Sequence, residues 1–337
     1  MHVLVTGATG FLGAEICREL LARGHAVRAL VRPASGLAGL AGLALEVARG
    51  DVLDRASVAA ALAGCDALVH AAGLPHIGGD AREVFAVNVR GAELVLGAAL
   101  EARVSRAVLT SSVSAGGGTR APAVMDESTP GNAEALGIGY FASKLRGERA
   151  GLALAARGLP LVVVRPAVVL GPGDTHRSSA EIVVGIARRR LPGWIEGGTS
   201  FCDVRDVARG HAEALERGRA GEVYLLGGHN LRVSELVARV AALAGVPPPP
   251  RIAYSAAWAG AALQELAARV RGRRAGVNRE LVRAARLFTF VSSAKAEREL
   301  GYAIRPFDEM VLDTLRFAIA SGRLRPESPQ LRALATG

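Results

Sequence analysis

The hydrophobic pattern alternates between short β-branched runs and alanine-rich segments with helical spacing. Strands are predicted at residues 3–5, 26–31, 45–48, 67–70, 106–109, 161–164 and 221–226. Helices are predicted between them at residues 13–23, 57–62, 84–102 and 140–157. This alternation is typical of βα units, so we expect an α/β fold with a doubly wound parallel sheet and helices on both faces, that is, a Rossmann fold.

A second region interrupts and follows this pattern. Residues 1–170 and 200–228 are predicted to form the larger domain, which contains the sheet, and residues 171–199 and 229–322 a smaller, mostly helical C-terminal lobe. Helices are expected in this lobe at residues 255–270, 278–287 and 294–300. The tail, residues 323–337, is rich in Arg, Pro and Ser, and we expect it to be loosely ordered.

Composition limits the partners that this chain is expected to bind. The net charge is +10, but the arginines are scattered and only 4% of residues are aromatic, so we expect no nucleic-acid partner. The apolar stretch at residues 256–268 is interrupted by Gln264 and Glu265 and is too short for an integral membrane segment. Its amphipathic character leaves a peripheral membrane contact open.

The cysteines and the start of the chain indicate the compartment. Cys17, Cys65 and Cys202 lie far apart without metal-ligand spacing, so no disulfide framework and no metal site are expected. No secretory signal is readable after Met1. We therefore expect a cytoplasmic protein.

A glycine-rich segment directly follows the first predicted strand. Gly7, Gly10 and Gly13 lie between that strand and an apolar-periodic helix. Backbone can then approach a pyrophosphate at the helix N-terminus, which predicts a dinucleotide site. The other interpretation is a tight turn that binds nothing.

Two further positions bear on the cofactor. Arg32 follows the second strand, where NAD-selective sites carry an acid for the ribose hydroxyls. A cation there suits the 2′-phosphate of NADP, so NADP(H) is the preferred cofactor and NAD(H) the alternative; a solvent-facing arginine is the competing interpretation. Asp51 and Val52 follow the third strand and are candidates to face the adenine; the alternative for Asp51 is a residue of a helix N-cap region.

The candidate acid/base pair is Tyr140 and Lys144, because a spacing of four places both side chains on one helix face. A nearby ammonium and a cationic nicotinamide ring favour the phenolate form of a tyrosine. Lysine is otherwise found only at Lys295 in this arginine-rich chain, which supports a specific role for Lys144. Ser111 and Ser112 follow the fifth strand, where a hydroxyl can hold a substrate oxygen. Their positions in the sequence do not show which of the two serines has this role.

In order and spacing, several segments resemble one family. They are residues 6–13, 50–51, 70–73, 88–91, 110–112, 140–144, 165–166, 171–172 and 203–207. The chain is similar over nearly its whole length to the extended short-chain dehydrogenase/reductase superfamily, also called the NAD-dependent epimerase/dehydratase family. It most resembles the dihydroflavonol 4-reductase and 3β-hydroxysteroid dehydrogenase branches.

The resemblance implies a role for each matching residue. Tyr140 is implied to be the acid/base, Lys144 to bind the nicotinamide ribose, and Ser112 to polarise the substrate oxygen. The implied cofactor-binding set comprises Gly7, Thr9, Gly10, Phe11, Leu12, Gly13, Arg32, Asp51, Val52, Ala71, Ala72, Gly73, Asn88, Lys144, Pro166 and Val168. The closing segment around Lys295 resembles a structural helix of these enzymes.

One position separates the candidate functions. Nucleotide-sugar epimerases of the superfamily tend to carry asparagine where this chain has Val168, and that residue touches the substrate diphosphate in them. We therefore expect an NADP(H)-dependent ketoreductase or alcohol dehydrogenase that acts on a mainly apolar small-molecule substrate. Arginines of the second lobe, Arg177 and residues 188–190, offer other partners for a diphosphate.

Two other functions stay open. One is an NAD(P)-dependent nucleotide-sugar epimerase or dehydratase, and the other is a catalytically silent cofactor sensor. The substrate pocket is expected to draw on the loops at residues 74–80 and 119–137. The resemblance also implies a homodimer formed through the helices near Val84 and Tyr140.

Overall fold

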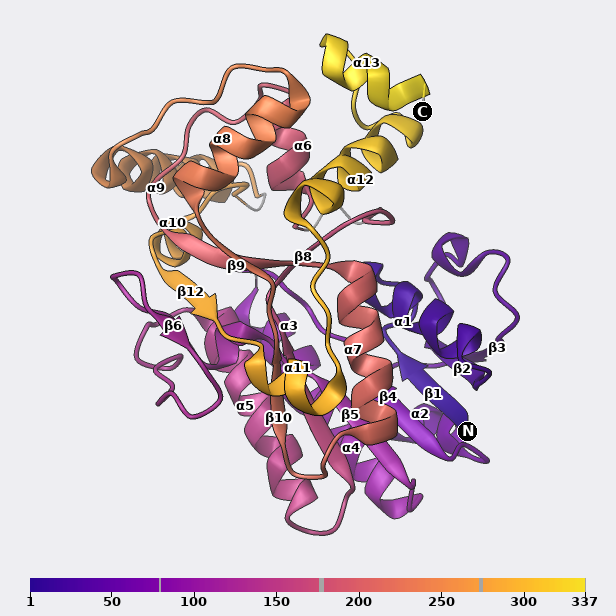
Figure 1. The fold of residues 1–337 in the computed structure, drawn as a ribbon. Coiled ribbons are helices and arrows are strands. Elements are labelled where there is room, and N and C mark those ends of the chain that lie inside the picture. The colour runs from indigo at the N-terminus through magenta and orange to yellow at the C-terminus, as the bar shows by residue number, and fades with distance from the viewer. Residues whose placement is uncertain (79, 176–178, 273–274, 337) are drawn as a thin grey trace.

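The architecture comes from a computed structural model, which describes residues 1–78, 80–175, 179–272 and 275–336. A seven-stranded sheet, parallel throughout, forms its larger part (Figure 1). The strand order is β10-β7-β5-β4-β1-β2-β3. The strands are β1 (His2–Thr6), β2 (Ala26–Val31), β3 (Glu46–Arg49), β4 (Ala67–His70), β5 (Arg106–Thr110), β7 (Leu161–Pro166) and β10 (Val223–Leu226). The predicted doubly wound parallel sheet is confirmed.

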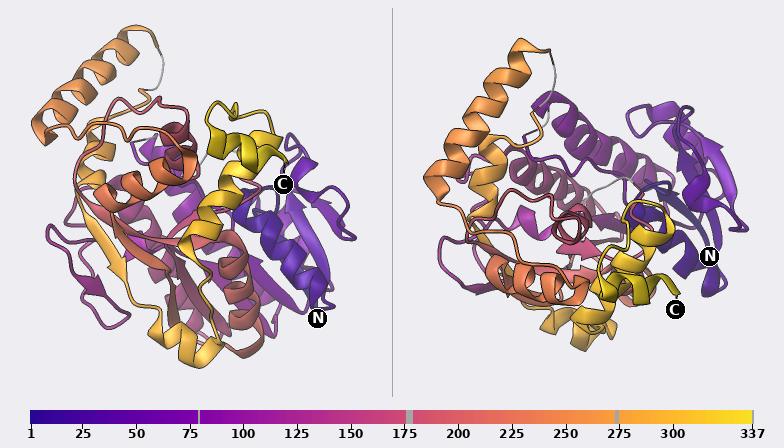
Figure 2. Two further views of the ribbon diagram at one scale, coloured as in Figure 1. Left: turned by 45° about the horizontal axis from the view of Figure 1, so that its top comes forward. Right: turned by 90° about the horizontal axis from the view of Figure 1, so that it is seen from above.

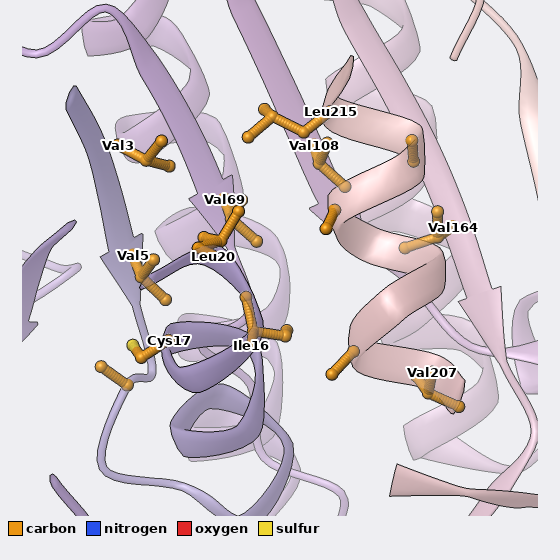
Figure 3. Close-up of a cluster of buried hydrophobic side chains, with 14 of the residues drawn as sticks. Val3, Val5, Ile16, Cys17, Leu20, Val69, Val108, Val164, Val207 and Leu215 are labelled. Carbon is orange, nitrogen blue, oxygen red and sulfur yellow. The ribbon is translucent and has the colours of Figure 1, made fainter. Parts of the chain in front are cut away.

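Helices cover both faces of this sheet, and alternate residues of each strand serve the two faces. Val3 and Val5 of β1 pack against α1 (Phe11–Ala22) and α7 (Val204–Arg217) in one buried cluster (Figure 3). Leu4 belongs to the opposite cluster. The helices of that opposite face are α2 (Arg55–Leu62), α4 (Ala92–Glu101) and α5 (Gly139–Ala155). The continuous apolar strands are therefore explained by burial on both faces.

The single helix predicted at residues 84–102 is wrong in detail. The segment is divided into α3 (Ala81–Phe85), a π-helical stretch η2 (Ala86–Gly91) and α4. Apolar spacing does not reveal a π-helical turn, because one wider turn changes the hydrogen bonding without removing the buried side chains.

A second sheet, which the hydrophobic pattern did not predict, takes strands from both predicted domains. Its order is β11-β9-β12-β6, and β8 also pairs with β9. The strands are β6 (Val124–Met125), β8 (Val168–Leu170), β9 (Gly198–Asp203), β11 (His229–Arg232) and β12 (Phe288–Val291). β9 and β11 carry polar residues among the apolar ones and so lack the apolar runs that predict the strands of the large sheet.

The remaining helices belong mostly to this lobe. They are α6 (Glu181–Ala187), α8 (Val233–Ala244), α9 (Tyr254–Val270), α10 (Arg279–Ala285), α12 (Phe307–Ala320) and α13 (Pro329–Thr336), with α11 (Ala294–Leu300) and the short turns η1 (Ala38–Leu40) and η3 (Val113–Ala115) elsewhere. Helix α11 packs against α7 and β10. Its Lys295 donates to Glu222 and to the carbonyl of Val223, both at 2.7 Å, which is a structural role. No helix in the described part of the chain is long and apolar enough to cross a membrane.

The expectation of a loosely ordered tail is wrong for residues 323–336. Helix α13 packs on α12 and α8, and Leu331 is buried at its contact with them. The Ser328 hydroxyl holds the start of the helix by donating to Ala244 O and accepting from Leu331 N. Two leucines, Leu324 and Leu331, supply the buried area that composition alone did not suggest.

Leu331→Ala should lower the free energy of unfolding by about 2–5 kcal/mol, because it leaves a cavity in the hydrophobic cluster that Leu331 shares with α6, α8 and α12, which we call the second hydrophobic core. Urea denaturation followed by circular dichroism measures this change. The matched control is Leu263→Ala on α9, where the side chain is 68% exposed and the same substitution should change stability little. Equal effects of the two substitutions would show that α13 is not part of the folded core.

Candidate active site

The glycine-rich turn after β1 lets backbone segments approach one another more closely than residues with a side chain would permit. Gly7 has a φ of +72°, and a Cβ on it would lie 2.6 Å from the backbone N of Ala72. A Cβ on Gly13 would lie 2.1 Å from Gly7 O. The first turn of α1 starts directly after Gly10, so its free N–H groups face this loop. We call the turn that contains Gly7, Gly10 and Gly13 the glycine cradle. Its backbone N–H groups fit the pyrophosphate of a dinucleotide.

The same contact brings two predicted cofactor segments together. Ala71, Ala72 and Gly73 follow β4, and Ala72 N donates to the Thr6 hydroxyl at 3.3 Å. That hydroxyl also lies 2.7 Å from Nδ1 of the buried His70. Burial and the nearby charge of Lys144 lower the pKa of His70 to about 3, so this ring is neutral and structural.

The carboxyl ends of β2 and β3 carry the other predicted cofactor residues. Arg32 is exposed just beyond β2, and Arg49 Nη1 donates to its carbonyl at 3.3 Å. The Asp51 carboxylate accepts from Leu53 N at 2.9 Å, which makes it part of a turn. Val52 lies against Gly91, where an added Cβ would be 3.3 Å from its Cγ2.

Tyr140 and Lys144 lie one turn apart at the start of α5. The Lys144 ammonium donates to Thr110 O at 2.9 Å, which fixes it at the carboxyl end of β5. Burial lowers the pKa of Lys144 to about 8, and the charge of Glu148 opposes this shift. Burial raises the pKa of the Tyr140 phenol, and a hydrogen bond with the Ser112 side chain opposes that shift. In the protein alone, the pKa of Tyr140 is therefore raised by burial, opposed only by Ser112, and the expected lowering by Lys144 is not found.

The structure distinguishes the two serines that sequence position left equivalent. Ser111 donates to Glu148 Oε2 at 2.6 Å, whereas Ser112 is the partner of Tyr140. Arg165 donates to both oxygens of the same carboxylate, at 2.9 and 2.5 Å. Ser111 is thus occupied by a buried ion pair, and Ser112 is the hydroxyl beside the candidate acid/base.

Glu148 is the residue of this site that the sequence analysis missed. It is 3% exposed and lies eight residues after Tyr140, so Tyr140, Lys144 and Glu148 share one face of α5. The repeated spacing of four was the available signal. A carboxylate buried this deeply requires the bidentate Arg165 and the Ser111 hydroxyl to offset its desolvation.

Asn88 lies in the π-helical stretch and anchors the loop that follows β4. Its amide exchanges two hydrogen bonds with the backbone of Leu74, at 2.8 and 3.1 Å, and donates to the Ser143 hydroxyl at 3.0 Å. An added Cβ on Gly73 would lie 3.2 Å from Asn88 Oδ1 and 3.5 Å from Lys144 Nζ. Asn88 therefore lies beside Lys144. The side-chain oxygen and the side-chain N–H groups of Asn88 already form hydrogen bonds with protein atoms.

The remaining predicted residues lie where the two sheets join. Pro166 ends β7, and Val168 starts β8, where it pairs with Phe201 of β9. Val168 also packs against the second hydrophobic core. Of the arginines proposed for a diphosphate, Arg177 lies outside the described residues and Arg188 is paired with Glu181 at 3.8 Å. Arg189 and Arg190 are exposed. Within the described ranges no group of three or more His, Cys, Asp and Glu side chains is placed to hold a metal ion.

Comparison with curated proteins identifies relatives that cover most of this chain. Sterol demethylase protein B of Methylococcus capsulatus is 38% identical over 74% of this chain and 76% of its own length. A 4-hydroxy-2-methyl-3-oxo-4-farnesyl-3,4-dihydroquinoline-1-oxide ketoreductase of Stigmatella aurantiaca is 34% identical over 96% of this chain and 98% of its own. Other relatives bear names of the dihydroflavonol 4-reductase and 3β-hydroxysteroid dehydrogenase types.

Solved structures show the same fold. The crystal structure of gox2253 has a TM-score of 0.84 and 38% identity, and the match covers 96% of this chain and 99% of that one. MoeE5 in complex with UDP-glucose and NAD has a TM-score of 0.73 and 26% identity, with coverages of 95% and 99%. The model of the NAD dependent epimerase/dehydratase family matches residues 3–227, which include the glycine loop, Ser112, Tyr140 and Lys144. This chain belongs to the NAD-dependent epimerase/dehydratase family of oxidoreductases.

Proposed function

We propose that this protein is an NADPH-dependent ketoreductase that transfers a hydride to a mainly apolar carbonyl substrate. The observation that carries the proposal is the grouping of Ser112, Tyr140 and Lys144 at the carboxyl end of β5, beside the glycine cradle. Ligands of open α/β sheets bind at this edge. The silent-sensor alternative is disfavoured because both Tyr140 and Lys144 are present and placed together.

Each site residue has a proposed task in this reaction. When bound, a reduced nicotinamide would supply the hydride, and the positive charge on its ring after transfer would favour the phenolate that Tyr140 becomes on giving up its proton. Ser112 donates a hydrogen bond to the carbonyl oxygen, and Tyr140 protonates that oxygen as negative charge develops on it. Lys144 holds the nicotinamide ribose through its ammonium while Thr110 O fixes the position of that ammonium. Gly7, Thr9, Gly10, Phe11, Leu12 and Gly13 are proposed to bind the pyrophosphate.

Val168 supports the choice of an apolar substrate. Its side chain offers no hydrogen bond, and a diphosphate left unpaired in a closed pocket would be costly by several kcal/mol. The relative from Stigmatella aurantiaca is named as a ketoreductase of a farnesylated quinoline, and the one from Methylococcus capsulatus as a sterol demethylase component. Both names refer to largely apolar molecules. We propose that the second lobe contributes most of the corresponding pocket.

A nucleotide-sugar epimerase or dehydratase is the second candidate. The specific support is the structural likeness to MoeE5, which was solved with UDP-glucose and NAD. The same tyrosine chemistry would serve both reactions. They differ in whether the hydride returns to the substrate, so the two candidates predict different cofactor consumption.

We further propose a cytoplasmic homodimer. The outer faces of α4 and α5 form a surface cleft lined by side chains that include Glu93, Leu100 and Leu154. Pairing of these helices between two copies would cover that cleft. The three free thiols, two of them buried, are consistent with a reducing compartment.

Tyr140→Phe should lower turnover by roughly 10²- to 10⁴-fold while cofactor affinity stays nearly unchanged, because one proton donor and little volume are removed. Steady-state NADPH oxidation measures turnover, and fluorescence titration measures cofactor binding. Tyr254→Phe on α9 is the matched control and should be active. Wild-type turnover in the Tyr140 variant would remove Tyr140 from the mechanism.

Arg32→Ala should weaken NADPH binding by roughly 10- to 100-fold and leave NADH binding unchanged, because a charge-assisted contact with the 2′-phosphate is lost. Isothermal titration with each cofactor measures the difference. Arg298→Ala on α11 removes a similarly exposed guanidinium as a control. If the wild-type protein binds both cofactors equally, Arg32 is only a surface residue.

The reaction class is tested by offering aryl and alkyl ketones beside UDP- and dTDP-sugars. We expect NADPH to be oxidised in proportion to ketone, with the alcohol as product. Chromatography of products and nicotinamide absorbance are measured together. Epimerised sugar without net cofactor turnover would favour the second candidate over the ketoreductase.

A further inference from the structure

Helix α9 packs on the protein through one side and leaves three large apolar side chains exposed on another. Leu263, Leu266 and Val270 are 68%, 61% and 81% exposed, and their spacing of three and four places them on one face. Single exposed leucines are normal, but three large apolar side chains gathered on one helix face mark an interaction surface. We call these three residues the outer apolar face of α9.

The opposite side of α9 holds the helix on the protein. Ala261 is buried in a small cluster with Ile195 and Val282, and Trp258 packs against it. The polar residues are tied to the chain that follows: Gln264 accepts from Val277 N at 3.2 Å, and Glu265 accepts from Arg279 N at 2.7 Å. The outward position of the leucines is therefore fixed by specific contacts. Both views in Figure 2 place this orange helix at the rim of the molecule.

The surrounding sequence concentrates positive charge beside this face. Residues 251–286 hold eight arginines and two glutamates, so they carry a net charge of +6 out of the chain's +10. Arg269 and Arg271 are exposed at the C-terminal end of α9 and flank the outer apolar face on either side. One of the two glutamates, Glu265, is neutralised by Arg279 at 2.8 Å.

We propose that the outer apolar face of α9 docks this protein on an anionic lipid surface. An apolar helix face flanked by arginines lies in the plane of the interface, where the leucines enter the acyl boundary and the guanidinium groups meet lipid phosphates. A second copy of this chain is a poorer occupant. A twofold-symmetric contact would place the same arginine-rich segment against itself, and like charges would then face each other.

The position of α9 gives this docking a consequence for the active site. Helix α10 follows α9, and its Glu280 accepts from Gly139 N at 2.6 Å, directly before Tyr140. Arg283 of α10 donates to Gly137 O at 3.1 Å. Docking would thus place the lipid surface one helix away from the start of α5. If the proposed ketoreductase function holds, an apolar substrate could be drawn from that surface, but the docking itself does not depend on that function.

The test is co-sedimentation of the full chain with vesicles made of equal parts phosphatidylcholine and phosphatidylglycerol, compared with phosphatidylcholine alone. We expect binding to the anionic vesicles and at least about tenfold weaker binding to the neutral ones. High salt should weaken binding to the anionic vesicles because it screens the arginines. Absence of sedimentation with anionic vesicles would overturn the proposal.

Two variants separate the apolar and charged contributions. The double variant L263S/L266S should bind the anionic vesicles at least about tenfold more weakly, and R269Q/R271Q roughly 10- to 30-fold more weakly. Val47→Ser, at an exposed valine of β3 on the far side of the sheet, is the control and should bind like the parent (Figure 1). The substituted side chains are exposed, so circular dichroism should show an unchanged fold. Binding of both double variants at the level of the parent protein would overturn the proposal. A smaller assembly of L263S/L266S than of the parent in light scattering would also overturn it, in favour of a second copy as the occupant.

Discussion

The contact between the β1–α1 turn and the loop after β4 determines where everything else in the site can lie. Gly13 lets α1 approach the Gly7 carbonyl, and Gly7 in turn lets the backbone of Ala71 and Ala72 approach the turn. A Cβ at either glycine would meet backbone atoms, which cannot move aside like a flexible side chain. Since Ala71 and Ala72 continue into Gly73 beside Lys144, the position of the glycine-rich turn and that of the Lys144 ammonium are linked through one stretch of backbone.

A second constraint comes from charge rather than from space. Lys144, Glu148 and Arg165 form a row of alternating charges, in which Lys144 donates to Thr110 O and Arg165 donates to both carboxylate oxygens of Glu148. Removing one member would leave an uncompensated buried charge, which is far more costly than losing the pair. The row therefore orders the carboxyl end of β5, and it assigns Ser111 to structure and Ser112 to the tyrosine. Thr110 is fixed from the other side, because its hydroxyl lies 2.9 Å from Nε2 of the buried His211.

Sequence reasoning succeeded where the signal is local and repeated. The strands of the large sheet are buried on both faces and read as apolar runs, and the glycine spacing and the Tyr140/Lys144 spacing are short-range features. Sequence reasoning failed for β12 and β9. These two strands pair with each other across a long stretch of sequence, and a local pattern does not reveal such a pairing. Glu148 was missed because its role depends on Arg165 and Ser111, which only folding brings to it. The order of the tail also depends on distant partners, since Leu331 gains its burial from α8 and α12.

The substrate, too, is determined by residues that only folding brings together, so the fold of the large sheet does not identify it. Gly7, Tyr140 and Lys144 are positioned by the large sheet, and this part of the molecule serves reductases and epimerases alike. The chemical difference must come from the residues that face the substrate, and the proposed substrate contact is Val168, at the junction of β8 with the second sheet. A valine at this point fits an apolar molecule and gives nothing to a diphosphate, and Arg188 is already engaged by Glu181. The reductase interpretation therefore depends on the second lobe, because the large sheet alone is compatible with both reactions.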